Sequence, residues 1–271
     1  MKKSIRFISM AAAAVIAASA MCFTAGATYY GENLLTNPDA SGGTKGWKDP
    51  DKAWTTVDSY KDITPYDGKF FMPKDLKGKK GVTACIYQDI PLKNCAGKKA
   101  QIRGHLRTVD GRKGDNLIIK MEFLDSKGEV ISWNAASTKW SDNWGVFASY
   151  ADVPDGAVKA RISMNVEYNK GDYADGAFDD ISFIIDGVKR SDLVSSKTSQ
   201  KKRSYLIKNG DTVKPDDVFP KAGKGKVKWT SSDEKIVTVD DSGNITGKFR
   251  GFATVTAKNG KEKVTIKVEV E

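Results

Sequence analysis

The sequence predicts an all-β protein made of two β-sandwich domains, a larger one followed by a smaller one. Most of its 271 residues fall into short segments in which apolar and polar side chains alternate, which is the period of a strand. No window sustains the 3.6-residue period of an amphipathic helix. Turn signals such as Lys127-Gly128 and Ser242-Gly243 separate the segments, as is typical of sandwiches.

The composition is that of a globular protein and excludes several classes of function. Hydrophobic residues make up 39% of the chain and charged residues 29%, which excludes collagen-like, low-complexity and multi-span membrane proteins. The single histidine, His105, excludes multi-histidine metal sites and most histidine-dependent triads. The sequence shows no nucleic-acid recognition motif, so we expect no nucleic-acid partner.

Residues 1–27 have the organisation of a secretory signal peptide. Lys2, Lys3 and Arg6 precede a charge-free run from Met10 to Phe23, and small residues follow up to Ala27. This apolar run is shorter than the roughly 20 residues that a membrane-spanning helix needs. We therefore expect a secreted, extracellular protein that begins at Thr28, has no transmembrane segment and acts free or at a cell surface.

The mature chain would keep two cysteines, Cys85 and Cys95, ten positions apart in an oxidising compartment. The pair is compatible with a small disulfide loop. Two buried thiols acting as small apolar side chains are the alternative.

A polar, Ser/Lys-rich stretch at residues 188–203 is the predicted linker between the domains. It separates a larger domain, residues 28–187, from a smaller one, residues 204–271. The larger part is almost neutral, whereas residues 200–271 carry 16 basic and 10 acidic side chains. The basic character of the chain therefore belongs to its C-terminal part, which could attract an anionic polymer.

Three predicted strands of the larger domain have one apolar and one polar face. His105 and Arg107 lie on the polar face of the strand at residues 101–108. Glu122 has the same position in the strand at 117–123, and Asn165 in the strand at 160–167. If the three strands share a sheet, these side chains form one polar surface on which a ligand can bind.

Motifs along residues 33–185 resemble those of galactose-binding-like jelly rolls, which include family 4/9/22-type carbohydrate-binding modules and the F-box-associated sugar-binding domain. The resemblance starts at Asn33–Pro38 with Gly46-Trp47, continues through Ile86–Ile90 and ends at Gly176–Phe183. It implies a jelly-roll sandwich that binds a saccharide. Such domains often hold a structural calcium ion, for which the matching carboxylates are Asp179 and Asp180.

Four segments of the smaller domain resemble a bacterial Ig-like group 2 domain. They are Val227–Asp233, Ile236–Asp240, Gly243–Gly247 and Gly251–Ala257. The resemblance implies a spacer or display module without a catalytic site. It also implies that Trp229 belongs to the core.

Sugar recognition needs an aromatic face on which a pyranose ring stacks, and polar groups that bind its hydroxyls. The segment from Ser132 to Trp144 holds three tryptophans among Asn, Lys, Ser and Asp residues. We expect Trp144 to pack in the core, and Trp133 and Trp140 to be stacking platforms. Trp47 and Trp54 are expected to be structural. The predicted polar ligands are Arg107, Glu122, Asn165 and His105.

The leading hypothesis is an exported, non-catalytic protein that binds a polysaccharide or oligosaccharide, with the Ig-like domain as its spacer. One alternative is a structural or adhesive cell-surface protein whose partner is another surface protein or an anionic cell-wall polymer. The other is a weak glycosidase or esterase, because Glu122 and Glu167 are two carboxyls that could share a face.

Overall fold

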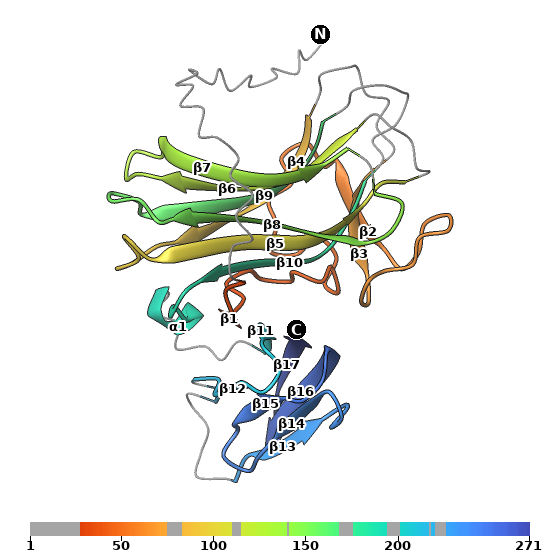
Figure 1. Cartoon of the computed structure of the whole chain (residues 1–271), viewed down its shortest axis with the longest axis vertical. Helices are drawn as coiled ribbons and strands as arrows, with labels where there is room; N and C mark the ends of the chain where they lie inside the picture. Colours follow the sequence, from red (N-terminus) through yellow and green to blue (C-terminus); the bar gives the residue numbers. More distant parts are fainter. Residues whose placement is uncertain are drawn as a thin grey trace.

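The structure is a computed structural model, and it shows two β-domains stacked one on the other (Figure 1). It describes residues 28–74, 83–109, 115–139, 141–167, 176–193, 201–216, 218–219 and 226–271. Within these residues the one helix is the four-residue α1 (Arg190–Leu193), so the all-β prediction is confirmed. No helix in the same residues is long and apolar enough to cross a membrane.

The larger domain is a sandwich of a four-stranded and a five-stranded sheet. The four-stranded sheet has the order β4 (Thr83–Pro91), β9 (Lys159–Glu167), β6 (Asn116–Leu124), β7 (Val130–Thr138). The five-stranded sheet has the order β2 (Trp54–Val57), β3 (Phe70–Pro73), β10 (Ala177–Ile185), β5 (Lys99–Arg107), β8 (Gly145–Asp152). The strands pair antiparallel in both sheets. Apart from the neighbours β2–β3 and β6–β7, which pair within one sheet, the chain alternates between the sheets, which is the jelly-roll arrangement that the motifs implied.

The core lies between these two sheets and follows the predicted alternation. On β6 the side chains of Leu117, Ile119, Met121 and Phe123 are fully buried, and β9 contributes Ile162 and Met164 in the same way. Trp54 packs edge-on against Phe178 and is buried, as is Trp47, so both are structural as predicted. Trp144 is half-buried, with its ring against Phe70.

The expectation that three polar strand faces share one sheet is wrong. β6 and β9 are neighbours, but β5 lies in the other sheet. Alternation fixes which side chains share a face of one strand, but strand pairing depends on contacts between residues far apart in the chain. His105 and Arg107 therefore lie on the opposite side of the sandwich from Glu122 and Asn165.

The smaller domain has two sheets around its own core. One has the order β1 (Gly31–Glu32), β11 (Lys202–Ile207), β17 (Glu262–Val270), β16 (Gly251–Asn259), β13 (Lys228–Ser231). The other has the order β12 (Thr212–Val213), β15 (Ile245–Gly247), β14 (Val237–Val239). Trp229 is half-buried against this core, close to Gly243, whose φ is +82°. A Cβ at Gly243 would lie 2.5 Å from the indole, so this turn requires glycine.

The domain boundaries differ from the predicted ones at both ends. β11 begins at Lys202, inside the predicted linker, and α1 occupies another part of it. Gly31 and Glu32, assigned to the larger domain, pair with Leu206 and Tyr205 in the smaller one. A two-residue strand carries too little pattern to show which sheet it joins.

The disulfide left open by the sequence is not formed, because Cys85 and Cys95 are both free thiols. Cys85 lies within β4 opposite Asn165, whereas Cys95 is buried beyond the end of that strand and donates a hydrogen bond to the Lys93 carbonyl, 3.2 Å away. Burial raises the pKa of Cys85 to about 11, so its thiol stays protonated and unreactive at neutral pH.

Candidate functional site

The larger domain has two polar faces, one on the outside of each sheet. The outer face of the four-stranded sheet carries three of the predicted ligand residues, Trp133, Glu122 and Asn165. The outer face of the five-stranded sheet carries His105 and Arg107. Trp140 lies outside the described residues.

A row of four side chains crosses the four-stranded sheet from edge to edge, and we call it the sheet row. In the register of the sheet, Trp133 on β7 lies opposite Glu122 on β6, and Glu122 lies opposite Arg161 on β9. Arg161 in turn lies opposite Asp89 on β4. Because neighbouring strands lie about 4.8 Å apart, the sheet row is about 14 Å long.

Trp133 is the exposed aromatic end of the sheet row. It is 63% exposed, although tryptophan is usually buried on average. It lies on the edge strand β7, two residues from Ile131, which is also exposed. The indole of Trp133 is therefore accessible to a ligand, with Ile131 as an exposed apolar neighbour.

Ion pairs hold the polar part of the sheet row in place. Arg161 donates hydrogen bonds to Asp89 from Nε at 2.8 Å and from Nη2 at 3.3 Å. Its guanidinium lies 4.4 Å from the ring centre of Tyr87, a cation–π contact. Lys120 donates a 2.7 Å bond to Glu122. The polar groups are therefore fixed before any ligand arrives.

Asp89 is charged throughout the neutral range. Burial acts against its charge, but hydrogen bonds from Arg161 and Lys48 outweigh burial and lower the pKa of this carboxyl. Lys48 Nζ lies 3.0 Å from Asp89 Oδ2. Sequence analysis missed Asp89, Arg161, Tyr87 and Lys48. The alternation at residues 160–167 gave the only signal, since it placed Arg161 on the same face as Asn165.

Asn165 is at the other end of the same face and is mostly buried. Its amide donates a 2.9 Å hydrogen bond to Ser163 Oγ on the same strand. It therefore lies apart from the sheet row, and of the predicted ligands that the structure describes, the sheet row contains Trp133 and Glu122.

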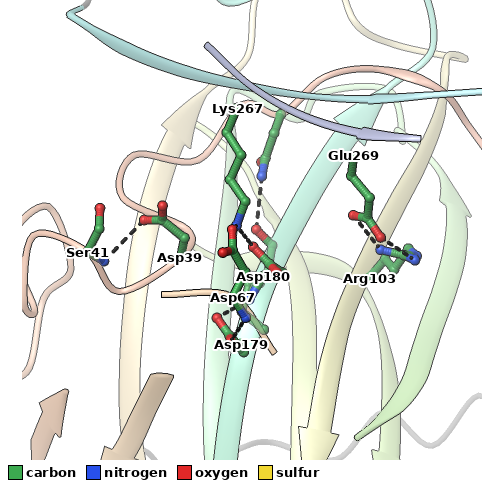
Figure 2. Close-up of polar contacts among 10 residues, drawn as sticks. Asp39, Ser41, Asp67, Arg103, Asp179, Asp180, Lys267 and Glu269 are labelled. Atoms are coloured by element: carbon green, nitrogen blue, oxygen red, sulfur yellow. Dashed lines mark hydrogen bonds and ion pairs between the residues drawn. The ribbon is translucent and has the colours of Figure 1, made fainter. Parts of the chain in front are cut away.

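The outer face of the five-stranded sheet is covered by the smaller domain (Figure 1). Arg103 on β5 donates hydrogen bonds to both carboxylate oxygens of Glu269 on β17, at 3.0 and 3.1 Å, and pairs with Glu271. Lys267 on β17 pairs with Asp180 on β10 and lies 2.6 Å from Asp67. Figure 2 shows Lys267 reaching from one domain to the aspartates of the other.

Asp180 therefore faces the smaller domain, and Asp179 lies beside it, where it accepts hydrogen bonds from the backbone N–H groups of Asp67 and Asp180. Burial and the neighbouring carboxylate raise the pKa of Asp179 to about 9, and burial raises that of Asp180 to about 7 despite the charge of Lys267. The Lys267 ammonium occupies the place beside Asp180 that a cation would take, so this arrangement does not fit calcium. The described residues contain no cluster of three or more His, Cys, Asp or Glu side chains suited to a metal ion.

His105 and Arg107 also have partners within the protein. His105 is 1% exposed and stacks on Tyr66, with 3.7 Å between ring centres, while Phe252 of the smaller domain meets Tyr66 edge-on. Burial, with the charges of Arg103, Lys267 and Arg250, lowers the pKa of His105 to about 3. Arg107 pairs with Asp62 at 2.8 Å.

Solved structures similar to this chain share low sequence identity with it. The enzymatically active domain of tailspike protein 4 of bacteriophage CBA120 is 18% identical, with a TM-score of 0.42, over 56% of this chain and 21% of that one. This chain therefore spans about a fifth of the tailspike domain's length. A family 16 carbohydrate binding module is 16% identical, with a TM-score of 0.41, over 56% of this chain and 99% of that one.

TmCBM61, solved in complex with β-1,4-galactotriose, is 16% identical, with a TM-score of 0.42, over 58% of this chain and all of that one. Among curated proteins none matches the sequence. The model of one family matches part of the chain: residues 194–268, which include β11 to β16 and most of β17, match the bacterial Ig-like domain (group 2).

Proposed function

We propose that the protein is an exported, non-catalytic glycan-binding protein whose binding surface is the sheet row. The observation that carries the proposal is the exposed indole of Trp133 at one end of a line of fixed polar side chains. A pyranose ring presents apolar CH groups on its face and hydroxyls around its rim. The sheet row offers an aromatic face to the CH groups and charged hydrogen-bonding groups to the hydroxyls.

Each member of the sheet row has a defined task in this proposal. Trp133 stacks on one sugar ring. Arg161 donates hydrogen bonds to hydroxyl oxygens of the next sugar unit, and Glu122 accepts hydrogen bonds from hydroxyl groups of that unit. Because Asp89 and Tyr87 already hold the Arg161 side chain, binding costs less conformational entropy than it would with a mobile arginine.

Non-catalytic binding is supported by the separation of the carboxyls on this face. Glu122 pairs with Arg161, and Glu167 lies six residues further along β9. At about 3.4 Å per residue the two are about 20 Å apart. Glycosidases hold their two carboxyls about 5–9.5 Å apart, so this pair does not form such a site.

The position of the smaller domain supports a role in display. It covers the five-stranded sheet, which leaves the sheet row on the opposite side of the sandwich (Figure 1). Ion pairs such as Arg103 with Glu269 hold it there. A support attached through this domain would therefore keep the glycan surface facing outward.

The test is retention of Trp133→Ala on a panel of polysaccharides. We expect a loss of affinity of about tenfold or more, because a stacked aromatic is the kind of residue that dominates binding energy. Phe249→Ala is the matched control, since Phe249 is an equally exposed aromatic (68%) in the smaller domain. Both variants should melt like the wild type. Wild-type retention by Trp133→Ala would refute the proposed surface.

A further inference from the structure

A pocket of about 180 Å³ lies beside the β4 end of the sheet row. Its apolar lining comes from Leu34, Ile90 and Leu193. Its charged lining comes from Lys48, Asp89 and Arg190. Pockets for drug-sized ligands start at about 300 Å³, so this one suits a single sugar unit.

The pocket and the sheet row are continuous because Asp89 belongs to both. Asp89 is the β4 member of the row and also lines the pocket. Lys48 bonds to Asp89, and its backbone pairs with that of Tyr87 along the edge of β4. A chain that lies across the sheet from Trp133 therefore reaches the pocket with its far end.

The pocket is rich in fixed positive charge. Two hydrogen bonds hold the Arg190 side chain in place. Its guanidinium donates one to the Leu34 carbonyl at 3.1 Å and one to Thr36 Oγ1 at 2.6 Å. Lys48 has a side chain that is 60% exposed. Asp89 is the one carboxylate of the pocket lining, and it binds both Lys48 and the bidentate Arg161. With Lys48 and Arg190 lining the pocket and Arg161 beside it, positive charge is in excess there, and this favours an anion.

We propose that this pocket binds an acidic sugar unit, one whose ring carries a carboxylate or a sulfate ester, at the end of the glycan that lies on the sheet row. The inference rests on the proposed function and names its substrate class. Lys48 and Arg190 donate to the anionic group, and the apolar side chains contact the ring. Neutral glycans of the same backbone bind through the sheet row alone.

The experiment compares matched acidic and neutral polysaccharides. The probes are polygalacturonate and its methyl ester for the carboxylate, and a sulfated galactan and its desulfated form for the sulfate. We expect the wild type to bind one acidic form at least about tenfold more tightly than its neutral partner. The variant Lys48→Gln/Arg190→Gln should lose this preference. The control variant Lys235→Gln/Lys258→Gln removes the same amount of charge from exposed sites in the smaller domain. It should keep the preference for the acidic form.

Lys48→Gln alone, at an exposed position, guards against a folding defect from the loss of Arg190 and should lower the preference while melting like the wild type. Equal binding of acidic and neutral forms through Trp133 would overturn the pocket assignment and leave the proposed function standing. Loss of preference in the Lys235/Lys258 variant would also overturn it, since general charge attraction would then be the cause. Failure of every glycan to bind would refute the proposed function itself, and with it this inference.

Discussion

At the scale of single residues, two adjacent aspartates illustrate how burial acts in different surroundings. Asp180 has Lys267 as its ion-pair partner. Asp179 has no ion-pair partner in the part of the chain that the structure describes, and its two carboxylate oxygens accept hydrogen bonds from the backbone N–H groups of Asp67 and Asp180. Burial and the nearby Asp180 raise the pKa of Asp179 to about 9. The folded protein therefore keeps a proton on Asp179 that the unfolded chain releases near pH 4.

This proton makes stability depend on pH in a defined direction. Between about pH 4 and pH 9 the folded state binds more protons at Asp179 than the unfolded state, so this group lowers the free energy of unfolding as pH rises. Asp179→Asn should remove that slope, whatever its effect on absolute stability. Urea unfolding at several pH values measures it, and an unchanged slope in the variant would contradict the prediction.

His105 should give the opposite dependence. Its pKa is lowered to about 3, so below about pH 6.5 the unfolded chain takes up a proton that the folded protein does not. Stability at this site therefore falls as the solution is acidified, by at most about 1.4 kcal/mol per pH unit.

The test of this dependence is His105→Phe. Neither ring nitrogen of His105 has a hydrogen-bond partner among the described residues, so Phe should keep the stack on Tyr66 without leaving an unpaired group. We expect higher thermal stability at pH 5, with less difference between pH 5 and pH 7. A variant as acid-sensitive as the wild type would show that the titration lies elsewhere.

The predicted ligands differ in how well sequence reasoning could place them. Trp133 was expected to be a stacking platform because it belongs to a segment with three tryptophans among polar residues, and the structure places it exposed on the edge strand β7. His105 and Arg107 were equally polar in pattern, but they meet residues outside their own strand. Tyr66, about 40 positions away in the chain, stacks on His105, and Phe252, about 150 positions away, packs against Tyr66. Alternation within a strand carries no information about such contacts.

At the scale of elements, the strand β17 shows that both faces of a strand can be committed to packing. Val264, Ile266 and Val268 face the core of the smaller domain. Lys267 and Glu269 alternate with them and bind the larger domain. Apolar and polar residues alternate along this strand, but nothing in its sequence distinguishes the polar face from an ordinary solvated surface. The charges that complement it lie on β5 and β10, which no local pattern connects to β17.

The turn before β15 allows a test of how Trp229 packs. Gly243→Ala should destabilise the protein by more than the roughly 1–2 kcal/mol that a left-handed backbone costs alanine, because the new Cβ would also meet the indole. Gly260→Ala is the matched control. It has φ +58° and no atom within 4 Å of its Cβ, so it should show the backbone cost alone. Equal thermal destabilisation by the two changes would mean that the Trp229 indole moves to accommodate the new Cβ.

At the scale of the whole molecule, the two domains form one unit through buried charges. Arg103 is 3% exposed and contacts both Glu269 and Glu271. Removing one partner of a buried ion pair leaves the other without compensation and costs about 3–5 kcal/mol. The sequence predicted a spacer or display module after a polar linker, and the structure adds ion pairs that join this module directly to the jelly roll.

This coupling predicts how the chain unfolds on heating. The wild type should show one calorimetric transition. Arg103→Met should separate it into two, because Glu269 and Glu271 are then left without their partner across the interface. Arg107→Gln on the same strand is the control, since the partner of Arg107, Asp62, is mostly exposed and such pairs contribute little. A single transition in Arg103→Met would show that other contacts maintain the coupling.

The short strand β1 has a mechanical consequence. Gly31 and Glu32 pair with β11, and β11 pairs with β17, so the jelly roll is inserted between two strands of the smaller domain's sheet. A force that pulls Gly31 away from Val270 would load the hydrogen bonds of that sheet first. The jelly roll would bear no tension until β1 had detached, and a protein stretched in this way would keep the sheet row intact.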